Sequence, residues 1–125
     1  MKILLVDDDT FLRDMYSTKF LECGHDVMPA VHAADALRIL ETVQDFDLML
    51  VDMIMPGMTG VELLVELQNS MPGLAMKRIV LSNQGQDQDI EEATEAGAIG
   101  YIIKAQSVPS EVVKKVEETF GEVEV

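Results

Sequence analysis

The chain has 125 residues, the length of one ordinary domain, and its 23 acidic residues against 9 lysines and arginines give a net charge of −14. This charge argues against binding to nucleic-acid phosphates or to an anionic membrane, because both need a basic face. At 48% hydrophobic, the chain is too apolar for an acidic disordered tail. Its longest unbroken apolar runs are four residues, far short of the roughly 20 that cross a bilayer. The single cysteine excludes an internal disulfide and fits a reducing, cytoplasmic location.

Short apolar runs recur along the chain at intervals of roughly twenty to thirty residues, enough for a helical crossover. Runs that do not alternate with polar residues are typical of strands buried on both faces of a parallel sheet. The pattern predicts five strands, at Ile3–Val6, Asp26–Val31, Leu48–Val51, Ile79–Leu81 and Ile99–Ile103.

The segments between these runs carry apolar residues at helical spacing. They predict helices over 12–23, Ala33–Thr42, 61–71, Asp89–Ala96 and from about Pro109 to Phe120. Cys23 falls on the apolar stripe of the first helix and is expected to be a small core residue. Five strands alternating with five helices form a (βα)5 pattern, so the fold class is α/β with helices on both faces of a doubly wound parallel sheet.

Polar side chains follow four of the five predicted strands. Asp7, Asp8 and Asp9 follow the first strand, and Asp52 follows the third. Ser82 follows the fourth, and Lys104 follows the fifth. In open α/β sheets, ligands bind beyond the carboxyl ends of the strands, and these carboxylates are expected to converge there if the first and third strands are neighbours. The alternative is that an aspartate after a strand forms a turn or caps a helix, and Asp9 is a candidate cap for the helix that follows it.

Clustered carboxylates repel one another unless a cation lies among them, and hard oxygen ligands favour Mg²⁺. A carboxylate beside Mg²⁺ can attack a phosphoryl group and become an aspartyl phosphate. A lysine and the metal would neutralise charge on the phosphoryl oxygens, and a serine hydroxyl could bond one of them. The residue types at this edge therefore predict phosphoryl chemistry.

Two segments carry a resemblance to a known family. They are Ile3–Asp8 (ILLVDD) and Leu50–Gly60 (LVDMIMPGMTG), and Ser82 and Lys104 complete the set. With them the chain resembles the receiver domain of two-component response regulators, the CheY-like superfamily of flavodoxin-like topology. The resemblance implies a strand order of 2-1-3-4-5, a receiver domain over residues 1–120 and a C-terminal tail over 121–125.

The resemblance also implies the role of each acidic residue. Asp52 resembles the phosphoacceptor. Asp7 and Asp8 resemble the acidic pair that holds Mg²⁺, with Asp52 and the backbone carbonyl of Met53 as further ligands.

Three further residues resemble the family's switch. Ser82 resembles the hydroxyl residue that swings inward to the phosphoryl group, Lys104 the lysine that pairs with it, and Tyr101 the aromatic residue that turns inward with the hydroxyl. The implied phosphodonor is a phosphohistidine on a sensor histidine kinase or histidine phosphotransfer protein. The implied target binds the face formed by the fourth helix, fifth strand and fifth helix.

Two positions depart from the family pattern. Ala105 follows Lys104 where the family commonly has a proline after a cis peptide; a cis bond before a non-proline residue costs about 2.5–4 kcal/mol, so we expect a trans peptide. Ile54 stands where many relatives carry a polar group. An apolar side chain there cannot orient an attacking water, so we expect Asp52 to lose phosphate slowly.

Two other functions compete with a phosphorylated receiver. A degenerate receiver would only bind a partner, which Ala105 keeps open although the set Asp7, Asp8, Asp52, Ser82 and Lys104 is intact. A small Mg²⁺-dependent phosphatase would also use an aspartate nucleophile, but the chain is short and lacks a cap segment for a substrate.

Overall fold

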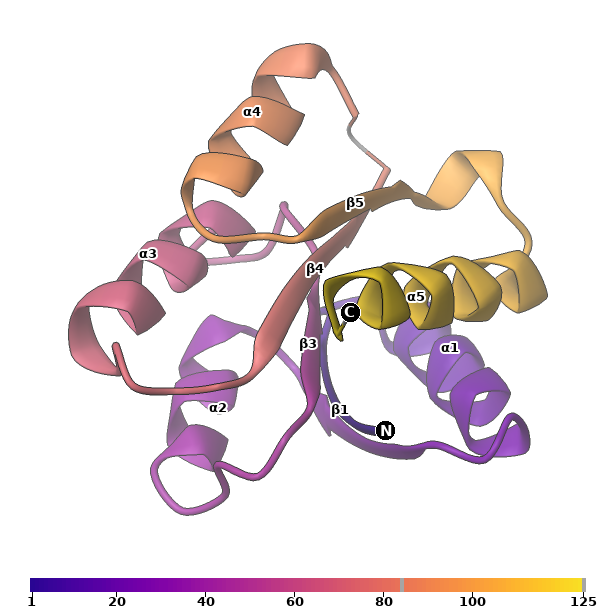
Figure 1. Ribbon diagram of the computed structural model, residues 1–125, viewed down its shortest axis with the longest axis horizontal. Helices are drawn as coiled ribbons and strands as arrows, with labels where there is room; N and C mark the ends of the chain where they lie inside the picture. The colour runs from indigo at the N-terminus through magenta and orange to yellow at the C-terminus, as the bar shows by residue number, and fades with distance from the viewer. Residues whose placement is uncertain (84, 125) are drawn as a thin grey trace.

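The computed structural model describes residues 1–83 and 85–124, which form a sheet with helices on both faces (Figure 1). The strands are β1 (Lys2–Val6), β2 (Asp26–Ala30), β3 (Leu48–Val51), β4 (Lys77–Ser82) and β5 (Gly100–Ile103). The helices are α1 (Thr10–Glu22), α2 (Ala33–Leu40), α3 (Gly60–Ser70), α4 (Asp87–Glu95) and α5 (Pro109–Glu124), with a 3₁₀ turn, η1 (Lys104–Gln106), after β5.

The sheet is parallel throughout and its strand order is β2-β1-β3-β4-β5. This confirms the predicted α/β fold class, the (βα)5 alternation and the strand order. Helices α1 and α5 cover one face, and α2, α3 and α4 cover the other (Figure 1). All five strands point the same way, so their carboxyl ends and the loops that follow them meet at one edge.

Each face of the sheet has its own apolar core, because successive strand residues point to opposite sides. Ile3 and Leu5 pack with Phe20 of α1 on one side. Leu4 and Val6 pack with Ala36, Leu64 and Ala93 of α2, α3 and α4 on the other. The central strands are buried on both faces, which explains their unalternating sequences.

Several element ends differ by one or more residues from the sequence expectations, and three of these differences are informative. The prediction that Cys23 is a core residue is wrong: α1 ends at Glu22, Gly24 turns the chain with a φ of 88°, and Cys23 is exposed at the helix end. Helix α4 begins two residues earlier than expected, because the Asp89 carboxylate accepts a hydrogen bond from the Gln86 backbone N–H at 3.2 Å and stabilises the first turn. Helix α5 continues to Glu124 and so includes residues 121–124 of the expected tail, while Val125 lies outside the described residues.

The helices that the described residues form are all too short or too polar to cross a lipid bilayer.

Candidate functional site

The pairing of β1 with β3 places Asp7 and Asp52 side by side. Val6 and Val51 are the last paired residues of the two strands. The Asp52 backbone N–H donates to the Val6 carbonyl at 3.0 Å and extends the ladder by one bond. Both aspartates therefore leave the sheet at the same level, at the carboxyl ends of neighbouring strands.

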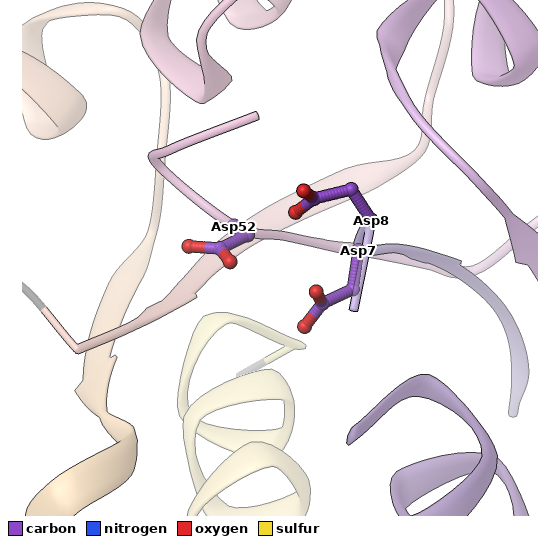
Figure 2. Close-up of side chains that lie close together, drawn as sticks. All are labelled: Asp7, Asp8 and Asp52. Carbon is purple, nitrogen blue, oxygen red and sulfur yellow. The ribbon is translucent and has the colours of Figure 1, made fainter. Parts of the chain in front are cut away.

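Three carboxylates converge at this edge. One oxygen from each of Asp7, Asp8 and Asp52 lies within 4.8 Å of the others, and the side chains come from the ends of β1 and β3 (Figure 2). Asp7 is only 1% exposed, Asp52 is half-buried and Asp8 is exposed. The cluster is thus buried on the Asp7 side and open to solvent on the Asp8 side. Carboxylates this close repel one another and need compensating positive charge.

Lys104 supplies one such charge from the end of β5. Its Nζ lies 2.6 Å from Asp7 Oδ2 and 3.2 Å from Asp52 Oδ2, and its side chain is 5% exposed. Burial alone would lower the pKa of the Lys104 ammonium, but the hydrogen bond to Asp7 and the charges of Asp52 and Asp7 outweigh it and leave the pKa above 10.5. Lys104 is therefore a fixed cation between two carboxylates. The peptide that joins it to Ala105 is trans, as predicted.

The loop after β1 holds Asp7 in place. Asp7 Oδ1 accepts the Asp9 backbone N–H at 3.0 Å, and the Arg13 Nη1 donates to the Asp7 carbonyl at 2.7 Å. Asp9 itself accepts a hydrogen bond from the Leu12 N–H at 3.0 Å. Asp9 is therefore the N-cap of α1, which was the alternative considered for it in the sequence. Arg13 was not identified from the sequence as a residue of the site. Its position on the first turn of α1, four residues after the Asp9 cap, was the sequence feature that placed it near Asp7.

Tyr16 of α1 is a second residue near the site that the sequence analysis did not single out. Its ring is buried in the core beside the site. Burial raises the pKa of its hydroxyl above 10.0, Lys104 lowers it, and the carboxylates of Asp7 and Asp52 raise it again. The Tyr16 hydroxyl is thus within electrostatic reach of the same three charged groups. No sequence pattern distinguishes it from an ordinary core residue.

The loop after β3 is pressed against the start of α3. A Cβ at Gly60 would collide with the Asp52 carbonyl oxygen, and the Gly60 N–H donates to the Met53 carbonyl at 2.9 Å. Thr59 and Glu62 form a capping box that fixes this first turn. The Met53 carbonyl therefore has one lone pair engaged and one remaining for a ligand. Its assignment as a metal ligand stays a prediction.

Ser82 and Tyr101 form a polar pair beside the cluster. Ser82 ends β4 and is 1% exposed, and Tyr101 of β5 is half-buried against the α3–α4 side of the core. Burial raises the pKa of the Tyr101 hydroxyl above 10.0 and the Asp89 carboxylate of α4 raises it further, while a hydrogen bond with Ser82 opposes both. The Tyr101 side chain is thus turned toward Ser82, and its electrostatic contact with Asp89 connects this pair to α4.

The set of donor atoms suits a small divalent cation. Three carboxylates offer the hard oxygen ligands that Mg²⁺ prefers, and Lys104 already engages Asp7 Oδ2 and Asp52 Oδ2. No donor among the described residues contacts the Asp8 carboxylate, which faces solvent. The open side of the cluster can therefore accept an ion that keeps several waters.

Comparison with known proteins gives one consistent family. The model of the response regulator receiver domain matches residues 3–117. A chemotaxis protein CheY homolog of Campylobacter jejuni is 30% identical over 122 residues, which cover 97% of this chain and 93% of that protein. The two-component response regulator PhoP of Pseudomonas aeruginosa is 36% identical over 105 residues, which cover 83% of this chain and 45% of that protein.

Solved structures agree with the sequence matches. A CheY-like response regulator receiver domain protein from Methanospirillum hungatei superposes with a TM-score of 0.85 at 32% identity, covering 98% of this chain and 95% of that one. The chemotaxis protein CheY4 of Vibrio cholerae gives a TM-score of 0.82 at 26% identity and covers 94% of this chain and 97% of its own. The chain therefore belongs to the response regulator receiver domain family of two-component signalling.

Proposed function

We propose that this receiver domain accepts a phosphoryl group on Asp52 from a phosphohistidine of a sensor histidine kinase or histidine phosphotransfer protein, in the cytoplasm. The observation that carries the proposal is the position of Asp52: its carboxylate ends β3 within 3.2 Å of the Lys104 ammonium and beside Asp7 and Asp8. A nucleophilic carboxylate, a fixed cation and two further acidic side chains are the groups that phosphoryl transfer to an aspartate needs.

In the proposed reaction, an Asp52 carboxylate oxygen attacks the phosphorus atom of the donor. An O–P bond forms, the P–N bond to the donor imidazole breaks, and the imidazole nitrogen takes up a proton. Lys104, whose raised pKa keeps it protonated, neutralises charge on the phosphoryl oxygens. Because the Lys104 Nζ contacts both Asp7 and Asp52, it is already positioned at the acceptor oxygen.

We propose that Asp7, Asp8, Asp52 and the Met53 carbonyl hold Mg²⁺ at the open side of the cluster. The ion would supply Lewis-acid stabilisation of negative charge on the transferred group. The chain's own contribution is to position the ligands: Asp9 and Arg13 fix Asp7, and the Gly60 N–H orients the Met53 carbonyl.

We further propose that phosphorylation acts on a partner through Ser82 and Tyr101. A phosphoryl group on Asp52 offers new oxygen acceptors to the Ser82 hydroxyl, which is now paired with Tyr101. Moving Ser82 changes the partner of the Tyr101 hydroxyl, and with it the surface of α4, β5 and α5. The proposed output is binding of a downstream protein to that surface; the domain is a signalling module and turns over no separate substrate.

The direct test uses phosphoramidate, whose P–N bond imitates phosphohistidine, and beryllofluoride, which imitates the bound phosphoryl group. The wild-type protein in Mg²⁺ is expected to gain the mass of one phosphoryl group and to show amide NMR shifts at Ser82, Tyr101 and α4. Asp52→Asn is expected to show neither change. Absence of any Asp52-dependent change would favour a binding module that is not phosphorylated.

Metal binding has its own control. Asp8→Asn removes the carboxylate that no donor contacts, and should weaken Mg²⁺ binding about tenfold or more with little loss of stability. Asp45→Asn removes an exposed carboxylate that pairs with Lys2, at the opposite end of β1 from Asp7, and should leave Mg²⁺ binding unchanged. Isothermal titration calorimetry or NMR is suited to this measurement, because the chain has no tryptophan to report binding by fluorescence.

A further inference from the structure

A shallow surface groove lies between α3 and α4, away from the carboxylate cluster. Val61, Val65 and Gln68 of α3 line one side, and Glu92 and Glu95 of α4, with Ala96 directly after it, line the other. Val65 is 40% exposed, which is unusual for an apolar residue in the middle of a helix of this chain. The groove thus has an apolar floor of two valines and an alanine with acidic side chains along its α4 rim.

The two helices that form the groove carry charged residues of one sign only. Helix α3 carries Glu62 and Glu66, and the nine residues of α4 include Asp87, Asp89, Glu91, Glu92 and Glu95. Residues 53–76 and 79–103 contain no lysine, arginine or histidine. Among the residues that the structure describes, the acidic side chains of α3 and α4 form no ion pair. Within the described part of the chain, the two acidic residues that line the groove, Glu92 and Glu95, therefore have no cation of their own.

Some carboxylates elsewhere on the described chain are paired with cations, as in Lys2–Asp45, Lys19–Glu22 and Arg38–Asp35. The like charges of α4 lie three and four residues apart, where they destabilise an isolated helix. A cationic ligand on this face would remove that repulsion, which gives it a favourable electrostatic interaction beyond simple contact.

We propose that the α3–α4 groove binds a helix of a partner protein that carries lysines or arginines on both sides of a short apolar stripe. The stripe would pack on Val61 and Val65, and the cations would lie against Glu92 and Glu95. This surface is distinct from the α4–β5–α5 face of the proposed output and needs no phosphoryl group on Asp52.

The groove favours a helix over an extended peptide. Its walls are two helices whose backbone groups bond within themselves, so it offers no free strand edge for main-chain pairing. An extended segment laid there would leave its own N–H and C=O groups without protein partners. A helix satisfies its own backbone, and its side chains at positions three and four apart match Val61 and Val65, which are four residues apart on α3.

The probe for the test is an end-blocked lysine–leucine peptide of about 14 residues, with its leucines at helical spacing. Its control is a peptide of the same composition in which leucine and lysine are rearranged so that no helical face is apolar. With unphosphorylated protein, the first peptide is expected to shift the amide NMR signals of Val61, Val65, Glu92 and Glu95. The control peptide, which has the same charge, is expected to bind at least about fivefold more weakly.

Matched variants then separate the groove from general attraction to an acidic protein. Glu92→Gln with Glu95→Gln should weaken binding about fivefold, whereas Glu111→Gln with Glu118→Gln on exposed α5 positions should change it less than about twofold. Val65→Ser, which leaves the charge intact, should also weaken it. Equal effects of the two charge pairs, or NMR shifts centred on α1 and α5, would overturn the proposal. So would a dimer of the chain alone that the Glu92/Glu95 variant dissociates, since the groove would then belong to a second copy.

Discussion

The Lys104 Nζ lies 2.6 Å from Asp7 Oδ2, although the two residues are 97 positions apart in the chain. Their side chains are 5% and 2% exposed, so the contact is almost out of water. The same ammonium reaches Asp52 at 3.2 Å. One cation therefore joins the end of β5 to the ends of β1 and β3 and offsets part of the repulsion among the carboxylates.

Removal of this cation should destabilise the metal-free protein. Lys104→Met keeps the apolar stem but leaves the Asp7 and Asp52 carboxylates without their ion-pair partner, and should lower the free energy of unfolding by about 3 kcal/mol. Added Mg²⁺ should recover part of the loss. Urea unfolding followed by circular dichroism, with and without Mg²⁺, measures both. Lys114→Met, at an exposed position of α5, is the control, with an expected change below about 0.5 kcal/mol. Equal stability of the two variants would contradict the role given to Lys104.

The side chain at position 54 should set the lifetime of phosphorylated Asp52. Ile54 is 55% exposed beside the cluster, and its N–H points to Asp52 Oδ1 at 3.4 Å. Ile54→Asn adds a polar side chain that can orient water, and should speed the loss of phosphate about tenfold. Decay of the phosphorylated protein after removal of phosphoramidate measures the rate. Val65→Asn changes an exposed valine of α3 in the same way and should leave the rate unaltered; a half-life of seconds in the wild type would refute slow loss.

The two tyrosines should ionise only above pH 10. Burial raises the pKa of both hydroxyls above 10.0 in the folded chain, and the unfolded chain has the ordinary value. A raised pKa contributes stability that is complete below pH 10 and is lost as the pH rises through the folded-state values, so unfolding should become easier in strong alkali. The raised pKa of Lys104 acts in the same direction.

Ultraviolet absorbance at alkaline pH measures this directly, because the chain has two tyrosines and no tryptophan. Tyr101→Phe leaves Tyr16 as the remaining signal and assigns the two midpoints. The same titration in denaturant should bring the midpoints back to about 10. A folded-state midpoint at or below 10 would show that the hydroxyls are more hydrated than the structure has them.

Gly60 should tolerate no side chain. Gly60→Ala places a Cβ against the Asp52 carbonyl oxygen, and should cost about 2 kcal/mol and slow phosphorylation by displacing Asp52. Thermal unfolding and the phosphoramidate reaction measure the two effects. Gly73→Ala is a matched control, since its Cβ would meet nothing within 4 Å, and should alter stability by less than about 0.5 kcal/mol. Similar losses in both variants would contradict the role given to the contact with the Asp52 carbonyl.

Much of the fold follows from local sequence. Runs such as Ile3–Val6 and Leu48–Val51 have no polar residue to face water, so only a sheet covered on both sides suits them. Apolar residues at helical spacing between them require crossovers, and the carboxyl ends of parallel strands then meet at one edge. The nearness of Asp7, Asp8 and Asp52 follows from this rule once β1 and β3 are neighbours, as in the strand order that the family resemblance implied.

Residues whose position depends on how an element ends or rotates were not predictable. Cys23 has the spacing of a core residue, but a turn at Gly24 takes it to the surface. Tyr16 and Arg13 both lie on α1. Only the packing of α1 against the sheet buries Tyr16 beside the site and lets Arg13 donate a hydrogen bond to the Asp7 carbonyl.

The sequence by itself determined the alternation of strands and helices, the polar residue at the end of each central strand and the excess of acid, because these depend on neighbours along the chain. Only the tertiary structure decided which cation meets which carboxylate, that Ser82 pairs with Tyr101, and that Glu92 and Glu95 of α4 line one groove with Val61 and Val65 of α3. Those relationships join residues far apart in the chain, and their distances depend on side-chain packing, which no local pattern encodes.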